Sequence, residues 1–358
     1  MEKDGYFYAR GTQDMKALDV AMIMTFLRLK REGYVPQRDL ILALTSDEEG
    51  GTANGAGWLI QNHRELVDAE VALNADNGGV STEKGKPRSV EVGAAEKLYA
   101  DFQLEVTNPG GHSSRPDQEN AIYRLARALG RLDNAPFPFE LNPVTRAFFT
   151  SIAGRETPAR KAAIEGVLQP TPAAAALTEF SKDARFNALT HTTCVATRLD
   201  AGHANNALPQ MARAIVNCRI LPGHSGEEVQ LELIRWLADD KVAVRYVDGS
   251  TGKVAEKAPA VRAMTPAEPR RDVMGAIGRT ADSFWPGAPV VIEMSTGASD
   301  SKYTAAAQIP SYGIGMLAVE NDDNRSHGKD ERIRVSSFYE AVEFNYRFVK
   351  ALTGSVVK

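Results

Sequence analysis

The chain has 358 residues, of which 43% are hydrophobic and 25% charged, and its formal net charge is −4 at pH 7. This composition is typical of a globular protein with more than one domain, and the acidic balance argues against nucleic acid as a partner. No apolar run reaches the ~18 residues that a membrane helix needs, so we expect no membrane partner either. The two cysteines, Cys194 and Cys218, are too few for a disulfide framework, and we interpret them as free buried thiols.

Helices and buried strands alternate at the start of the chain. Apolar residues spaced three and four apart predict a helix over residues 14–31, which ends at Gly33. The apolar runs at 40–45 and 70–75 predict strands that are buried on both faces of a parallel sheet, with a helix between them at about 54–66. This order indicates an α/β layer, in which functional sites lie beyond the carboxyl ends of the strands.

The pattern changes near residue 95. Hydrophobic residues alternate with polar ones over residues 99–106, which predicts a strand with one face exposed to water. The stretch 135–190 is rich in proline and alanine and predicts a helical insertion. The remaining predicted elements follow a β-α-β-β-α-β order that is typical of a ferredoxin-like domain. They are a helix at 118–132, strands at 192–199, 212–221 and 242–247, and a helix from 226 to 237 that a capping box opens at Ser225.

The α/β pattern resumes after residue 264. It comprises a helix at 270–282, strands at 290–292 and 312–314, and a last helix at 336–351. We therefore predict an α/β protein in which one domain is inserted into another. The discontinuous domain would span residues 1–94 and 264–358, and the inserted domain would span residues 95–263.

Carboxylates follow both of the first two predicted strands, and one histidine lies in a polar loop. Asp47-Glu48-Glu49 come after the first strand and Asp76 comes after the second, while Asp14 precedes the first helix and His327 precedes the last. Carboxylates and imidazole are ligands that suit zinc. Two adjacent glutamates can divide the work, because one can bind the metal while the other takes a proton from the metal-bound water.

The same residues also fit ordinary structural roles. Asp14 is placed to cap the first helix, the acidic triplet fits a solvated surface turn, and a histidine in a polar loop is usually solvated. Composition and spacing alone therefore leave both a metal site and a solvated surface open.

Seven segments along the chain carry a resemblance to a known family. They are YARGTQDMKA, ALTSDEEGG, ALNADNGG, NPGGHSSRP, NALPQMARAIVNCRILPG, GASDSKY and SHGKDE, in that order. Together they resemble the dinuclear-zinc aminoacylase and carboxypeptidase family of metallopeptidases. The resemblance implies zinc-dependent hydrolysis of an amide bond in a small peptide or N-acyl amino acid, as in a carboxypeptidase, dipeptidase or aminoacylase. It also implies an α/β/α zinc-peptidase domain with an inserted ferredoxin-like lid that forms a homodimer.

The resemblance assigns metal and catalytic roles to particular residues. Asp14 is implied to bridge two zinc ions and to have a cis peptide bond to Met15. Glu49 and His327 are implied to complete the first zinc site with Asp14, and Asp76 is implied to bind the second zinc. The general base is implied to be Glu48. Cobalt or manganese can occupy the same ligands.

Four residues outside the metal ligands also receive implied roles. His112, which on the residues alone fits a Gly-Gly-His surface turn, is implied to reach across a dimer and stabilise the oxyanion in the partner's active site. Asn206 and Arg219 are implied to hold the carboxylate of the substrate, and Gly297 to line the substrate pocket. Asp300 and Lys302, in the same loop as Gly297, are unassigned beyond stabilising that loop.

One family motif has no counterpart in this sequence. Family members carry a His-x-Asp motif upstream of the bridging aspartate, and its histidine binds the second zinc, but no His-x-Asp occurs here. We therefore expect that the chain is truncated at its N-terminus, which also leaves its cellular compartment open. One zinc site, made by Asp14, Glu49 and His327 with water as the fourth ligand, would still be complete. The alternative is a catalytically impaired or silent fragment that only dimerises.

Overall fold

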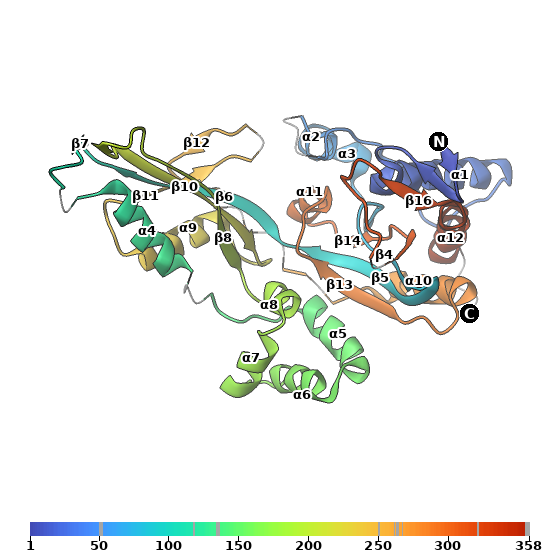
Figure 1. The fold of residues 1–358 in the computed structure, drawn as a ribbon. Helices are drawn as coiled ribbons and strands as arrows, with labels where there is room; N and C mark the ends of the chain where they lie inside the picture. Colours follow the sequence, from blue (N-terminus) through green and yellow to red (C-terminus); the bar gives the residue numbers. More distant parts are fainter. Residues whose placement is uncertain are drawn as a thin grey trace.

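The computed structural model has an elongated shape, with a large β-sheet in each of two lobes (Figure 1). It describes residues 1–49, 53–116, 119–133, 137–249, 251–260, 262, 265–266, 268–320 and 322–354. Among the described helices, none combines the length and the apolar character that a membrane span requires.

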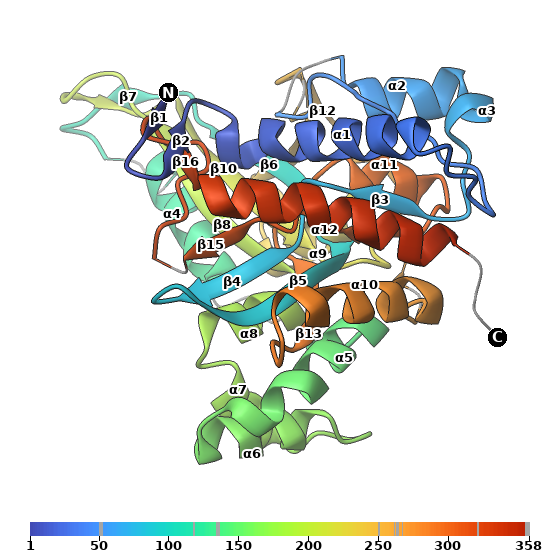
Figure 2. The same ribbon diagram turned by 90° about the vertical axis from the view of Figure 1, so that its right-hand side faces the viewer.

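The first lobe is built on a six-stranded mixed sheet. Its order is β15-β4-β5-β14-β3, with β13 parallel to β5. The strands are β3 (Ala72–Asn74), β4 (Gly79–Glu83), β5 (Lys86–Glu96), β13 (Val290–Ser295), β14 (Ser311–Gly313) and β15 (Ala318–Glu320). Figure 2 shows the helices α1 (Ala17–Arg31) and α12 (Val335–Thr353) side by side on one side of this sheet, with α10 (Arg271–Phe284) below them. The predicted alternation of helices and strands in the two outer parts of the chain is thus confirmed in outline.

A small three-stranded sheet joins the start of the chain to a segment near its end. It pairs β1 (Glu2–Lys3) with β2 (Tyr6–Tyr8), and β2 with β16 (Arg332–Arg334). The helical turn η1 (Thr12–Lys16) follows β2, and the loop that precedes β16 contains His327. The pairing therefore brings two distant parts of the chain to the same place.

The second lobe contains a five-stranded antiparallel sheet of order β12-β11-β6-β10-β8. Its strands are β6 (Leu98–Thr107), β8 (Thr193–Ala201), β10 (Met211–Ile220), β11 (Ala243–Val247) and β12 (Val254–Ala255), and its helices are α4 (Ala121–Leu132) and α9 (Gly226–Leu237). Without the short β12, the spatial order is fourth, first, third and second strand, which is the ferredoxin-like arrangement that the sequence predicts. The predicted capping box at Ser225 also forms, because Ser225 and Glu228 bond to each other's backbone N–H.

Four α-helices lie in the described part of the predicted insertion between α4 and β8. They are α5 (Pro143–Ile152), α6 (Pro158–Val167), α7 (Ala174–Phe180) and α8 (Ala184–Thr190). Their apolar side chains, such as Phe148 and Phe149, share a core with Val291 and Met294 of β13. These helices therefore pack against the sheet of the first lobe, although they belong to residues 95–263.

The predicted strand at 40–45 is wrong. The structure assigns no strand there, although the helices that follow, α2 (Gly55–Asn62) and α3 (Arg64–Val67), agree with the prediction. Ile41 and Leu44 are 49% and 55% exposed, so the segment is not buried on both faces. An apolar run becomes a strand only where a neighbour offers backbone hydrogen bonds, and none of the described strands pairs with this segment.

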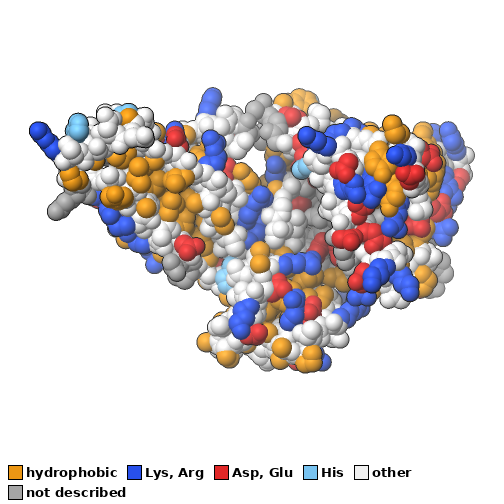
Figure 3. Space-filling view, viewed as in Figure 1, with side chains coloured by type: hydrophobic (Ala, Val, Ile, Leu, Met, Phe, Trp, Pro, Cys, Tyr) orange, Lys and Arg blue, Asp and Glu red, His pale blue; other side chains and the backbone are white. Residues whose placement is uncertain are grey.

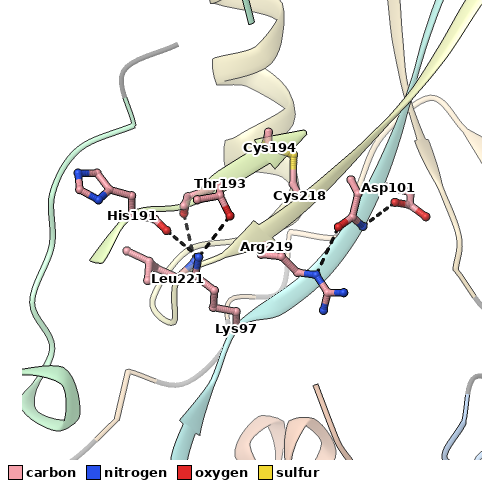
Figure 4. The surroundings of a disulfide bond; sticks show 10 residues. Lys97, Asp101, His191, Thr193, Cys194, Cys218, Arg219 and Leu221 are labelled. Atoms are coloured by element: carbon pink, nitrogen blue, oxygen red, sulfur yellow. Dashed lines mark hydrogen bonds between the residues drawn. A yellow bond between two sulfur atoms is a disulfide. The ribbon is translucent and has the colours of Figure 1, made fainter. Parts of the chain in front are cut away.

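The expectation of free thiols is also wrong, because Cys194 and Cys218 form a disulfide (Figure 4). The two residues lie directly opposite each other on the antiparallel strands β8 and β10, with their Cα atoms 4.1 Å apart. Their 24-residue separation in the sequence conceals this proximity, which only the register of the two strands creates.

Candidate metal centre

Three of the predicted metal ligands converge on one point. The Nε2 atom of His327 lies 2.9 Å from Oδ2 of Asp14 and 3.0 Å from Oε2 of Glu49. One possible ligand atom from each of the three residues lies within 4.8 Å of the other two. Two carboxylates and one imidazole make a donor set that suits zinc, and the exposure of Glu49 and His327 leaves the group open to a ligand.

The three ligands come from three separate loops. Asp14 lies in the turn η1, and its peptide bond to Met15 is cis, as the resemblance implies. Glu49 lies in the loop between the segment 40–45 and α2, and His327 lies between β15 and β16. The guanidinium of Arg10 is 3.6 Å from the Glu49 carboxylate, so one more charged group faces the centre.

Glu331, which has no role predicted from the sequence, connects two of these loops. Its side chain is fully buried, and its Oε2 accepts hydrogen bonds of 2.7 Å from the Gly11 backbone N–H and from the Arg10 guanidinium. Its Oε1 accepts bonds from the backbone N–H groups of Gln13, at 2.8 Å, and Asp14, at 2.9 Å. Burial favours a higher pKa for Glu331, but these bonds hold its pKa below the usual value. The only sequence signal for this role is its place in SHGKDE.

Glu48 and Asp76 lie in the same acidic region but outside the group of three. Burial raises the pKa of Glu48, and the nearby carboxylates of Asp300 and Glu49 raise it further. Burial also raises the pKa of Asp76, to about 8, with added repulsion from Glu48 and Asp14. Asp14 and Asp76 line a common cavity of about 370 Å³. A cation in this region would favour the ionised form of each carboxylate.

Gly297 and Arg219 lie on either side of the junction between the two lobes. Gly297 is in the loop between β13 and α11 (Ser301–Ala306), where its N–H donates to the Ser295 hydroxyl. Arg219 is on β10 of the second lobe, with its guanidinium 4.7 Å from the centre of the Tyr99 ring and its Nε donating to Asn217. Neither residue belongs to the group of three ligands.

The structure brings His112 and Asn206 together, but away from the metal ligands. His112 lies on the short strand β7 (Gly111–His112), which pairs with β9 (Ala207–Leu208), and the N–H of Ser113 donates to the Asn206 carbonyl at 3.0 Å. Both side chains are exposed. Figure 1 shows β7 at the tip of the second lobe, at the opposite end of the molecule from α1 and β16. Within one chain these two residues therefore do not reach the candidate metal centre.

The sequence of the chain is similar to that of a known family of peptidases and to individual members of it. The model of a family described as Peptidase family M20/M25/M40 matches residues 1–351. A probable carboxypeptidase S-like protein of Dictyostelium discoideum is 29% identical over 97% of this chain and 66% of its own length. An N-fatty-acyl-amino acid synthase/hydrolase of Bos taurus is 27% identical over 98% of this chain and 69% of its own length. The chain thus spans about two thirds of the length of these relatives.

Solved structures share the fold. A metallo-carboxypeptidase from Sulfolobus solfataricus matches 99% of this chain and 79% of its own, with a TM-score of 0.65 and 17% sequence identity. A di-peptidase from Saccharomyces cerevisiae matches 98% of this chain and 74% of its own, with a TM-score of 0.61 and 14% identity. The fold is thus an α/β domain with an inserted second domain.

Proposed function

The chain belongs to peptidase family M20/M25/M40, and from this membership we propose that it is a metal-dependent hydrolase of amide bonds. The substrate would be a small peptide or an N-acyl amino acid with a free carboxylate. The names of its relatives, which refer to carboxypeptidases and to N-acyl amino acids, support this substrate class. The observation that carries the proposal is the convergence of Asp14, Glu49 and His327 within 4.8 Å, with Glu48 beside Glu49 in the sequence.

Asp14, Glu49 and His327 would hold the metal, and Glu48 would move the proton. Zinc, or cobalt or manganese in its place, supplies a Lewis acid that polarises the scissile carbonyl and acidifies water. Glu48 accepts a proton from the attacking water and passes it to the leaving nitrogen. Its half-buried position and its raised pKa suit a carboxylate that must both take up and release a proton.

Asp76 would belong to a second metal position. It lies outside the group of three ligands, and the sequence has no His-x-Asp motif to supply a histidine beside it. This observation favours the alternative function, a catalytically silent protein that only dimerises. The two candidates differ in one result, because a silent protein shows no hydrolysis at any zinc concentration.

We also propose that residues 95–263 act as a lid and dimerisation domain on a catalytic domain formed by 1–94 and 264–358. Figure 3 shows hydrophobic side chains gathered on the lobe that contains β8 and α4. Val195 and Leu199 of β8 are 61% and 67% exposed, and β8 is an edge strand. An exposed apolar edge strand favours pairing with another chain. In a homodimer the partner's His112 would stabilise the oxyanion, while Asn206 and Arg219 bind the substrate carboxylate and Gly297 lines the pocket.

The test replaces the proposed base and leaves the ligands in place. Glu48→Gln should reduce turnover of N-acyl amino acids and dipeptides by a factor of at least ~100 while the protein keeps its bound zinc. The matched control is Glu65→Gln, which changes an exposed glutamate on α3 and should leave turnover unchanged. Near wild-type turnover in Glu48→Gln would refute the role of Glu48. No turnover by the zinc-loaded wild type would favour the silent alternative.

A further inference from the structure

The turn Ser299–Ser301, between β13 and α11, contacts two of the loops that carry acidic residues of the metal centre. We propose that Asp300, at the middle of this turn, is a positioning residue that holds the loop of Glu48 and Glu49 at the metal centre. The inference rests on the proposed function, since it assigns the turn a task in the same site.

Asp300 clamps the two ends of that loop. Its Oδ1 accepts a hydrogen bond of 2.6 Å from Nδ2 of Asn54, and its Oδ2 accepts one of 3.2 Å from the hydroxyl of Thr45. Thr45 precedes Glu48 and Glu49 in the chain, and Asn54 follows them. One carboxylate therefore joins the two stems of the loop. Hydrogen bonds to an ionised acceptor are about twice as strong as those between neutral groups.

Asn54 passes this restraint on to the backbone of the loop. Its Nδ2 also donates to the Asp47 carbonyl at 3.3 Å, directly before Glu48. Its Oδ1 accepts from the Gly57 N–H at 2.9 Å and so caps the N-terminus of α2. A backbone hydrogen bond of 2.9 Å, from the Gly55 N–H to the Ser46 carbonyl, also joins the two ends of the loop. The hydrogen bond from Asn54 to Asp300 thus fixes the position of the N-terminus of α2, where the loop of Glu48 and Glu49 ends.

The other side of the turn is anchored to the strand that leads to Asp76. Nδ2 of Asn74 donates to the hydroxyls of Ser299, at 2.9 Å, and Ser301, at 2.8 Å. Oδ1 of Asn74 accepts from the Asp76 N–H at 2.9 Å. The N–H of Ser299 donates to the mostly buried carboxylate of Glu96 at 2.9 Å. Asp300 therefore ties the loop of Glu48 and Glu49 to a turn that is itself fixed beside Asp76.

The helices that follow Asp300 and the loop, α11 and α2, pack closely against each other. The helix that follows Asp300, α11, presents the ring of Tyr303 to Gly57 of α2, and a Cβ atom on Gly57 would lie only 2.7 Å from that ring. The two helices thus approach as closely as a glycine allows. Asp300 itself is outside the group of three metal ligands, and both of its oxygens already accept hydrogen bonds. These two bonds act on the centre through the loop, in addition to the charge repulsion between the Asp300 carboxylate and Glu48.

The experiment measures zinc affinity and kinetics in parallel. Residues that orient metal ligands typically contribute 10–100-fold to metal affinity or activity. Asp300→Ala should therefore bind zinc about 10–100-fold more weakly in competition with a chromogenic chelator, and lower kcat with little change in KM. Asp300→Asn can still accept from Asn54 and should recover most of both losses. Asn54→Ala should weaken zinc binding to a similar extent, and combining it with Asp300→Ala should add little further loss.

A matched control separates positioning from general stability. Asp183→Ala removes the cap of α8, where the Asp183 carboxylate accepts from the Phe186 N–H at 3.0 Å, and should lower stability without weakening zinc binding. The proposal would be overturned if Asp300→Ala bound zinc with an affinity within a factor of two of that of wild type. It would also be overturned if Asp300→Asn did not restore the zinc affinity. Because zinc affinity is read without a substrate, an inactive wild type would refute the proposed function and still leave this inference testable.

Discussion

Replacing Glu331 by alanine should destabilise the protein more than any exposed charge substitution. The change removes the acceptor of four hydrogen bonds of 2.7–2.9 Å and leaves the donors at Arg10, Gly11, Gln13 and Asp14 without this partner. Each of the three backbone N–H donors that loses its acceptor costs about 1–3 kcal/mol, and less where water can reach it. The Arg10 guanidinium adds little, because its side chain is 54% exposed. We therefore expect the free energy of unfolding to fall by about 3–5 kcal/mol, with a weaker zinc site because η1 loses its anchor.

The assay is urea denaturation of the metal-free protein, which separates folding from metal binding. Glu83→Ala, which breaks an exposed ion pair with Arg88 at 3.3 Å, is the control and should change the free energy of unfolding by at most ~1 kcal/mol.

The pH dependence of the free energy of unfolding gives a second readout. Because the pKa of Glu331 is lowered in the folded state, its contribution is present above the unfolded pKa of about 4.3 and is lost as the pH falls through the folded pKa. The difference between wild type and Glu331→Gln should accordingly narrow below about pH 4. A loss below ~1 kcal/mol in Glu331→Ala at pH 7 would refute the reasoning.

Two further predictions concern the junction of the lobes. Replacing Cys194 and Cys218 by serine should lower the free energy of unfolding by about 3 kcal/mol, because the disulfide no longer closes a 24-residue loop in the unfolded chain. Equal urea midpoints for the oxidised wild type and the double variant would contradict this prediction. Burial lowers the pKa of Lys97 to about 7, while its ammonium donates to the His191 carbonyl at 2.7 Å. Between about pH 7 and pH 10, Lys97 thus carries a proton in the unfolded chain that it lacks in the folded chain. The free energy of unfolding of wild type should therefore rise with pH relative to that of Lys97→Met. The control variant Lys182→Met should show no such trend relative to wild type.

The regular elements could be predicted because their signals are local. The ferredoxin-like lobe follows from periodicity and the capping box at Ser225, both of which the structure confirms. The convergence of Asp14, Glu49 and His327 was predicted from a resemblance, since residues so far apart in the sequence carry no local signal of contact. The expected cis peptide bond after Asp14 came from the same source and is confirmed.

The features that sequence reasoning missed all depend on a neighbour that is distant in the sequence. The apolar run at 40–45 has the composition of a buried strand, but no described strand pairs with it. Cys194 and Cys218 meet only through the register of β8 and β10. The insertion at 135–190 was expected from its composition, but its packing on the first sheet depends on the position of β13. Glu331 has a role that only its burial and its four bonds reveal.

The metal content of the purified chain shows directly whether the proposed metal centre forms. Elemental mass spectrometry after dialysis against a zinc-containing buffer and then against a metal-free one should give about one zinc or more per chain for wild type. His327→Ala, which removes the imidazole and leaves both carboxylates, should give close to none. No zinc in the wild type, or equal zinc in wild type and His327→Ala, would contradict the claim that Asp14, Glu49 and His327 form the metal centre.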